Sequence, residues 1–286
     1  MTRSYTRKRA RKDASNIMGA PLVTSPHPGR FDGHEYPQML PPIDDIRPGP
    51  SAPWASLPLS ARTGLTLDRV VDQMRSRGRH RDSGSLPGVP DEVAALAAAR
   101  GEPLTRRSAV LVALFEEAGE ARVVLTRRAL HLRHHRGEVA FPGGRTDGDE
   151  SPADTALREA FEEVGIAPES AELVGWLSPI ATFASGSAIW PVVATLPGRP
   201  TYVIDPSEVD RAYDVALADL VHPDNHRTEL WRRATTRPGS DPEGYFAINL
   251  YRVPGDLVWG ATARILTELL CVVTGVEWPD EGKTWG

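Results

Sequence analysis

The chain has 286 residues, 40% of them hydrophobic, and a formal net charge of −5. This length can bury one sizeable core or two small ones, and the mildly acidic total argues against a nucleic-acid-binding role for the whole chain. No stretch is long and apolar enough to span a bilayer, and the basic start is not followed by the apolar region of a secretory signal. The one cysteine, Cys271, excludes an intrachain disulfide and fits a reducing compartment. We therefore expect a cytoplasmic protein without a membrane partner, in which Cys271 is a small core residue.

Residues 1–58 are rich in Pro, Gly, Arg and Asp and have few periodic apolar positions. This composition predicts an irregular and largely disordered arm. Four side chains could fasten part of the arm to a domain surface: Tyr36, Met39, Leu40 and Trp54. The first dozen residues carry six cationic side chains: Arg3, Arg7, Lys8, Arg9, Arg11 and Lys12. They are interpreted as a solvated end, with contact to nucleic acid or to a membrane surface as the alternatives.

Residues 59–104 are expected to form a helical lead-in to the main domain. A short helix from about residue 65 to 77 is predicted by four apolar side chains at helical spacing, Leu67, Val70, Val71 and Met74. The Ala-rich stretch 91–100 predicts a second helix, with Asp91 as its cap and Gly101 as its stop.

The pattern changes to strands in segment 105–276, which is expected to be the main domain and to precede a short tail, 277–286. Two apolar runs, 108–115 and 121–126, predict the strands of a hairpin. Further strands are predicted at 171–178, 188–196 and 245–252, with a short strand or turn at 212–220. The apolar positions of 261–273 predict a closing helix.

The helix predicted at 151–164 has clear start and stop signals. Ser151 can cap its first turn, Pro152 suits the first helical position, and Gly165 can end it. Its buried stripe is expected to consist of three side chains at positions i, i+4 and i+7, namely Leu157, Phe161 and Val164.

A different face of this helix carries three glutamates, Glu159, Glu162 and Glu163, at positions i, i+3 and i+4. Side chains at these spacings are neighbours, with Cβ atoms roughly 5–6 Å apart, so the carboxylates repel one another unless a cation lies among them. Oxygen ligands suit a hard divalent cation such as Mg²⁺ or Mn²⁺. Glu150 can add a fourth carboxylate, and Arg158 can orient a glutamate by a charge-assisted hydrogen bond. Taken alone, the same pattern also fits an ordinary solvated acidic helix face.

The residues before the helix make the pattern more specific. Phe141-Pro142-Gly143-Gly144 is a turn that lets the backbone approach a phosphate closely. Five residues separate Gly144 from Glu150, and seven more precede the run Arg-Glu-Ala-Phe-Glu-Glu-Val-Gly-Ile that ends at Ile166. This segment resembles the Nudix box, Gly-x5-Glu-x7-Arg-Glu-U-x-Glu-Glu-x-Gly-U, where U is a bulky aliphatic residue. Every fixed position matches, and Ala160 is smaller than the usual residue at U.

The resemblance implies an α/β fold, the Nudix α/β/α sandwich with a mixed sheet. It also implies hydrolysis of a nucleoside diphosphate linked to another moiety, with Mg²⁺ or Mn²⁺ ions that neutralise the diphosphate and activate water. Glu159 and Glu163 correspond to metal ligands, and Glu162 to a further ligand or to a residue that helps to activate the water. The catalytic residues expected from the resemblance are Glu150, Arg158, Glu162 and Glu163.

The upstream sequence resembles a second signature, which marks the coenzyme A diphosphatase branch of the Nudix family. It reads Val124-Leu125-Thr126-Arg127-Arg128-Ala129-x3-Arg133-x3-Gly137-x3-Phe141-Pro142-Gly143-Gly144, with valine where leucine is usual. The segment 259–264 resembles the closing segment of that branch. Coenzyme A carries a 3′-phosphate, and arginine is suited to bidentate phosphate recognition. The substrate contacts expected from this resemblance are Arg127, Arg133, Gly137, Phe141, Gly143 and Gly144.

Several interpretations stay open at this point. His131, His134 and Arg136 could equally belong to a solvated basic loop, and adjacent histidines such as His134 and His135 seldom point at one metal ion. The leading hypothesis is a coenzyme A diphosphatase that yields phosphopantetheine and adenosine 3′,5′-bisphosphate. One alternative is a Nudix hydrolase of ADP-ribose, NADH or an oxidised nucleotide. Another is a Nudix fold kept as a binding module, but the intact glutamates argue against it, because a binding module would not need all of them. The expected partner is a small nucleotide, and the oligomeric state is open, with a homodimer as one alternative.

Overall fold

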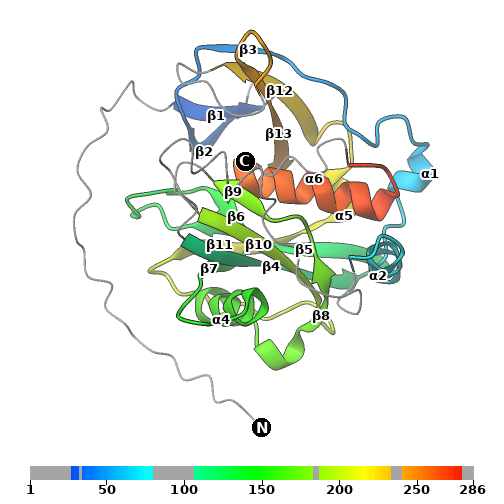
Figure 1. Ribbon diagram of the computed structural model, residues 1–286, viewed down its shortest axis with the longest axis vertical. Helices are drawn as coiled ribbons and strands as arrows, with labels where there is room; N and C mark the ends of the chain where they lie inside the picture. The colour runs from blue at the N-terminus through cyan, green and yellow to red at the C-terminus, as the bar shows by residue number, and fades with distance from the viewer. Residues whose placement is uncertain (1–26, 32–33, 80–105, 183–186, 233–239, 279–286) are drawn as a thin grey trace.

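A mixed sheet lies at the centre of the molecule (Figure 1). The computed structural model describes residues 27–31, 34–79, 106–182, 187–232 and 240–278. The main path of this sheet, in the order β11-β5-β4-β10-β8, consists of β4 (Arg106–Glu117), β5 (Glu120–Arg128), β8 (Glu172–Trp176), β10 (Ser187–Thr195) and β11 (Val209–Ala216). Three short strands pair along it: β6 (Val139–Ala140), β7 (Gly143–Arg145) and β9 (Ile180–Thr182). Because β10 runs parallel to β4 and the other pairs are antiparallel, the predicted mixed sheet is confirmed.

Strands β4 and β5 form the hairpin that the sequence predicts. Ala118 and Gly119 connect the two strands, and both have a positive φ, 54° and 79°. Two positive φ values in a two-residue turn match the right-handed twist of the flanking strands. The hairpin places β4 and β5 side by side. At the ends away from the turn, β4 pairs with β7 and β5 pairs with β6.

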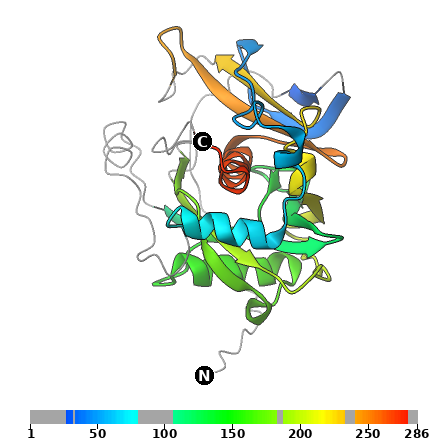
Figure 2. The same cartoon turned by 90° about the vertical axis from the view of Figure 1, so that its right-hand side faces the viewer.

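Helices cover both faces of this sheet, as the α/β/α expectation requires (Figures 1 and 2). Helix α4 (Pro152–Val164) packs on one face, against Leu111 and Ala113 of β4. Helix α6 (Gly260–Thr274) and helix α2 (Leu67–Ser76) pack on the other, against Val112 and Leu114 of the same strand. The alternation follows from the two-residue side-chain period of a β-strand.

A second sheet lies on the far side of α6 (Figure 1). Its order is β14-β13-β12-β3, with β3 (Asp45–Pro48), β12 (His226–Arg232), β13 (Tyr245–Val253) and β14 (Asp256–Val258). Helix α6 is therefore enclosed by two sheets, and its residues 265–274 are all buried. Cys271 is fully buried in this helix, which confirms the prediction that it is a core residue.

The described part of the arm, which was expected to be largely irregular, contains short strands. Strands β1 (His27–Phe31) and β2 (His34–Leu40) form a hairpin, and β3 joins the second sheet beside β12. Two of the expected fastening side chains are buried: Leu40 packs in the core of the second sheet, and Trp54 donates its indole N–H to the carbonyl of Val221 at 3.1 Å. The composition did not indicate these strands because each is short, and β3 also acquires its hydrogen bonds from β12, which is distant in sequence.

The remaining elements agree with the sequence at most positions. The region 212–220 divides into the end of β11 and the short helix α5 (Leu217–Leu220), whereas β12 has only two apolar residues and was not predicted. Helix α1 (Leu59–Arg62) and the 3-10 helix η2 (Pro168–Ser170) are short connecting turns.

The helix predicted at 91–100, the basic end and most of the tail lie outside the described residues. No helix in the described ranges is long and apolar enough to cross a membrane.

Candidate active site

Helix α4 begins and ends where the sequence predicts. The Ser151 hydroxyl accepts a hydrogen bond from the backbone N–H of Asp154 at 3.1 Å, and Pro152 occupies the first turn. Gly165 ends the helix in the left-handed conformation, with φ at 77°. Because both ends are fixed, the register of the glutamates on the helix is fixed as well.

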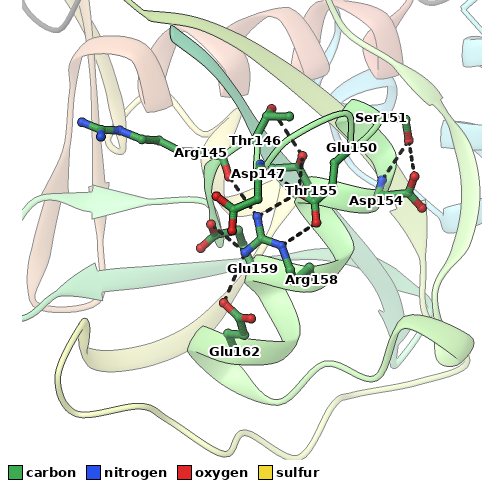
Figure 3. A network of polar contacts seen from close by, with 10 residues as sticks. All are labelled: Arg145, Thr146, Asp147, Glu150, Ser151, Asp154, Thr155, Arg158, Glu159 and Glu162. Carbon is green, nitrogen blue, oxygen red and sulfur yellow. Dashed lines mark hydrogen bonds and ion pairs between the residues drawn. The ribbon is translucent and has the colours of Figure 1, made fainter. Parts of the chain in front are cut away.

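Arg158 organises the exposed side of this helix (Figure 3). Its guanidinium contacts three carboxylates: Glu150 by two hydrogen bonds of 2.8 and 3.0 Å, Glu159 at 3.0 Å and Glu162 at 3.2 Å. It also donates to the carbonyl of Arg145 at 2.9 Å. We call Arg158 with these three glutamates the Arg158 cluster. The surrounding carboxylates raise the pKa of Arg158 against the opposing effect of its burial, so this side chain stays charged.

Glu150 closes the loop between β7 and α4. Besides Arg158, it accepts hydrogen bonds from the backbone N–H of Asp147 at 3.2 Å and the hydroxyl of Thr155 at 3.1 Å. Burial alone would raise the pKa of Glu150, but the hydrogen bonds from Arg158 and Asp147 outweigh burial and lower it. Glu150 and Arg158, both expected to be catalytic, therefore hold the loop onto the helix and orient Glu159 and Glu162.

Glu163 lies apart from the Arg158 cluster and is only 4% exposed. Its carboxylate accepts a hydrogen bond from the backbone N–H of Gly143 at 3.2 Å, and the guanidinium of Arg128 lies 3.9 Å away. Burial raises the pKa of Glu163 to about 8, the charges of Glu159 and Glu208 add to the rise, and Gly143 and Arg128 only partly oppose it. This carboxylate needs further positive charge to ionise at neutral pH.

The two glycines of the turn allow the carboxylates to lie against the backbone. A Cβ at Gly144 would lie 2.4 Å from the carboxyl carbon of Glu159, and one at Gly143 would lie 2.4 Å from the carbonyl oxygen of Ala109. Both glycines are in β7, which pairs with β4. They therefore serve close packing between the strand, the helix and a carboxylate, and the approach of this backbone to a phosphate stays a prediction.

Glu208 is a further acidic residue that the sequence analysis did not identify. Burial is the main cause that raises the pKa of Glu159, and the charges of Glu162 and Glu208 raise it further, against Arg158. The carbonyl of Glu208 accepts a hydrogen bond of 2.9 Å from the backbone N–H of Ala129. This contact lies next to the pairing of β11 with β5 and brings Glu208 toward the site. No local motif marks this residue, because only the sheet topology places it near the box.

The residues expected to bind substrate divide into three groups. Arg127 pairs with Asp210 at 2.5 Å and with Asp256 at 3.0 Å, so the structure assigns it to a support network away from the carboxylates. Phe141 is buried in the core between the sheet and α6, with only 3% of its surface exposed.

Arg133 is exposed in the loop that follows β5, together with His131, His134, His135 and Arg136. His135 pairs with Glu138 at 2.9 Å, and this contact raises its pKa against the effect of burial.

The donor set on α4 fits a hard divalent cation. Glu159 and Glu163 have pKa values that burial raises, and carboxylate oxygens are ligands that Mg²⁺ and Mn²⁺ accept. In the described part of the chain, no group of three or more acidic, histidine or cysteine side chains is arranged so that it could hold a metal ion. The fit is therefore one of chemistry, because buried carboxylates without enough positive charge would be stabilised by a cation.

Comparison with known proteins identifies the class. The model of the NUDIX domain matches residues 105–232. Two relatives, from Shigella flexneri serotype 5b and from Escherichia fergusonii, are each named "Uncharacterized Nudix hydrolase NudL". Each is 36% identical to this chain over 172 residues, which cover 59% of this chain and 83% of the relative. The solved MutT/nudix family protein from Enterococcus faecalis is 17% identical, with a TM-score of 0.40, over 69% of this chain and 71% of its own. The Nudix hydrolase RenU from M. smegmatis is 24% identical, with a TM-score of 0.32, over 38% of this chain and 69% of its own.

This chain belongs to the Nudix hydrolase family. It is therefore an enzyme of the class that hydrolyses the diphosphate bond of nucleoside diphosphate derivatives, and its substrate class is small nucleotides. Members of the family generally use divalent metal ions.

Proposed function

We propose that this enzyme hydrolyses the diphosphate bond of coenzyme A or its derivatives, giving phosphopantetheine, or its acyl form, and adenosine 3′,5′-bisphosphate. One observation carries the proposal: an exposed cationic loop follows the strand that carries Arg128 and, through the short strand β6, leads to the strand that carries Gly143 and Gly144. Arg128 and Gly143 both approach Glu163. A substrate held at the carboxylates would therefore have further cations beside it, which suits an additional phosphate.

The divalent cations, Mg²⁺ or Mn²⁺, are assigned to Glu159 and Glu163, with Glu162 as a further ligand. When bound, they would neutralise the diphosphate and lower the pKa of the attacking water. Glu162 is the most exposed of the three, with 40% of its side chain accessible, so it can also receive a proton from water that enters the site. Arg158 orients Glu159 and Glu162 through charge-assisted hydrogen bonds, which is a supporting role in catalysis.

Arg133 is the residue that we assign to the 3′-phosphate of coenzyme A. Its side chain is exposed, whereas Arg127, the other arginine expected to bind phosphate, is held by Asp210 and Asp256. A guanidinium can donate two hydrogen bonds to one phosphate. Selectivity for coenzyme A over nucleotides without this phosphate would then depend on the loop, because the residues of the Nudix box would bind only the diphosphate and its metal ions.

The first test is a substrate panel. The purified protein is incubated with Mg²⁺ or Mn²⁺ and with coenzyme A, acyl-coenzyme A, ADP-ribose, NADH and oxidised nucleotides, and the products are identified by mass. We expect the highest kcat/KM for a coenzyme A derivative. If ADP-ribose or NADH is cleaved faster, the substrate assignment is wrong although the family assignment stands.

The second test separates recognition of the 3′-phosphate from the reaction itself. Arg133→Ala should lower kcat/KM for coenzyme A by the equivalent of about 1.5–3 kcal/mol, because a charged hydrogen bond is lost. Dephospho-coenzyme A lacks this phosphate and should lose much less. Arg75→Ala, at an exposed arginine of α2, is the matched control and should change neither value. An equal loss on both substrates would mean that Arg133 contacts the diphosphate or is structural.

A further inference from the structure

The loop 129–136 that follows β5 is closed at its base by the backbone. The N–H of Gly137 donates to the carbonyl of Arg128 at 3.0 Å, and the N–H of Arg128 donates to the carbonyl of Glu138 at 2.9 Å. The exposed cationic side chains therefore lie on a loop whose two ends are adjacent. Whatever holds these ends in place also sets where the cations lie relative to the carboxylates of the box.

Both ends of this loop are tied to a single buried carboxylate, that of Asp256 in β14. Asp256 is fully buried, and its Oδ1 accepts hydrogen bonds from Arg127 at 3.0 Å and from the side-chain amide of Gln38 at 2.7 Å. Arg127 lies two residues before the loop, and it also pairs with Asp210. The carboxylate thus reaches the first end of the loop directly through Arg127.

Gln38 of β2 extends the same network to the second end of the loop. Its amide Nε2 donates to Asp256 and, at 3.0 Å, to the carbonyl of Gly137, while its Oε1 accepts from the backbone N–H of Leu257 at 3.1 Å. The side chain is fully buried, and both amide N–H groups and the oxygen have partners. A buried amide with all of its partners in place fixes one arrangement, because loss of a single contact leaves a buried polar group unsatisfied.

Gly137 is the residue through which the network acts on the loop. Its φ is +69°, in the left-handed region that glycine adopts without strain, and a Cβ there would lie 2.9 Å from a methyl of Leu130 inside the loop. The backbone at this point can turn sharply and pack under the loop at the same time. A hydrogen bond to its carbonyl therefore determines the direction in which the loop enters β6.

We propose that Gln38 and Asp256 are positioning residues that fix both ends of the 129–136 loop and so determine how strongly the enzyme selects a substrate with an additional phosphate. The inference rests on the proposed function for the identity of that substrate. It assigns a role in specificity to residues from two segments outside the Nudix box, one from the N-terminal arm and one from the second sheet. None of these residues contacts Glu159 or Glu163, so the chemical step should not depend on them.

The kinetic test uses Gln38→Met, which keeps the length of the side chain and removes its hydrogen bonds, and Asp256→Asn as a second variant. For both we expect KM for coenzyme A to rise by at least about five-fold, with kcat within about two-fold of the wild type. KM for dephospho-coenzyme A should change by less than about two-fold. Tyr251→Phe is the matched control, because it removes another buried hydrogen bond, the 2.6 Å contact with Thr267, far from the loop in the chain. This control should lower the melting temperature without changing either KM.

A second readout needs no substrate. Each variant is exposed to trypsin at the same interval below its own melting temperature, and cleavage after Arg133 and Arg136 is followed by mass. We expect faster cleavage at these two sites in Gln38→Met and Asp256→Asn than in Tyr251→Phe or the wild type. Equal rates in all four proteins, or a fall in kcat without a rise in KM, would overturn the proposal. If the wild type does not cleave coenzyme A, the proposed function fails, and the trypsin result alone decides whether the network positions the loop.

Discussion

Arg127 and Arg128 are neighbours on β5, yet they serve opposite faces of the central sheet. Arg128 leaves the strand on the face covered by α4 and lies 3.9 Å from the carboxylate of Glu163. Arg127 leaves it on the other face and pairs with Asp256 of the second sheet. The alternation of a β-strand separates the two side chains although the sequence presents them as one basic pair.

This difference divides the molecule into two regions with different tasks. The α4 face carries carboxylates whose charges are only partly compensated, and Glu163 with its pKa near 8 is the extreme case. The α6 face, the second sheet and the described arm carry aromatic packing and satisfied polar groups such as Gln38. Substitutions on the first should therefore change turnover, whereas substitutions on the second should change stability or the placement of the loop.

The largest effect is expected from Trp54→Ala, in the supporting region. Trp54 is only 1% exposed, its indole N–H donates to Val221, and its ring lies 5.1 Å from that of His226. Removing such a side chain should lower the free energy of unfolding by about 3–5 kcal/mol. Chemical denaturation measures the loss, and kcat measured well below the melting temperature should stay within about two-fold. A neutral result would show that the segment before α1 is an appendage.

Glu163→Gln should have the reverse profile. The amide keeps the size of the side chain but removes the charge that a cation needs, so kcat should fall by at least about 100-fold. The metal-free protein should melt at nearly the same temperature, because burial raises the pKa of the Glu163 carboxyl and its charge therefore adds little to stability. Steady-state kinetics at saturating Mg²⁺ and a thermal melt provide both values. Near-normal turnover would remove Glu163 from the metal site.

Gly144→Ala is expected to have a smaller effect in the same region. The added Cβ would lie within 2.5 Å of all three carboxyl atoms of Glu159, so this carboxylate must move. Displacement of a catalytic group by a fraction of an ångström should cost at least about ten-fold in kcat. Gly198→Ala is the control, because nothing lies near its Cβ and its φ is not in the left-handed region. If both variants keep full activity, Glu159 does not need its observed position.

The sequence predicted the two ends of the box helix correctly because their signals are local. The predicted buried stripe was wrong in part, because Leu157 and Phe161 are only half-buried, whereas Ala156, Ala160 and Val164 are buried. The residues that start and end this helix all lie within or next to it in the sequence. In the structure, Ser151 caps its start, Pro152 lies in its first turn and Gly165 ends it. The hairpin of β4 and β5 and the closing helix were likewise predictable from apolar runs. Such features depend on side chains only a few residues apart.

The features that the sequence did not yield depend on contacts between distant segments. The charge of Glu208 raises the pKa of Glu159 and Glu163 because the pairing of β11 with β5 brings it near them. Gln38 becomes a buried link only because Asp256, 218 residues later, is its partner. Arg127 was assigned to phosphate binding because the motif does not show to which face the side chain points. Strand β3 of the arm was not predicted for the same reason, since it is defined by its pairing with β12.

The central claim is that a divalent cation binds at Glu163 and Glu159 on the α4 face. Calorimetric titration of Mn²⁺ into the wild type, Glu163→Gln and Glu169→Gln measures this directly, with the exposed Glu169 of the nearby 3-10 helix as the control. We expect Glu163→Gln to weaken Mn²⁺ binding by at least about ten-fold and Glu169→Gln to leave it unchanged. Equal affinity in all three proteins would contradict the assignment of the cation to Glu163.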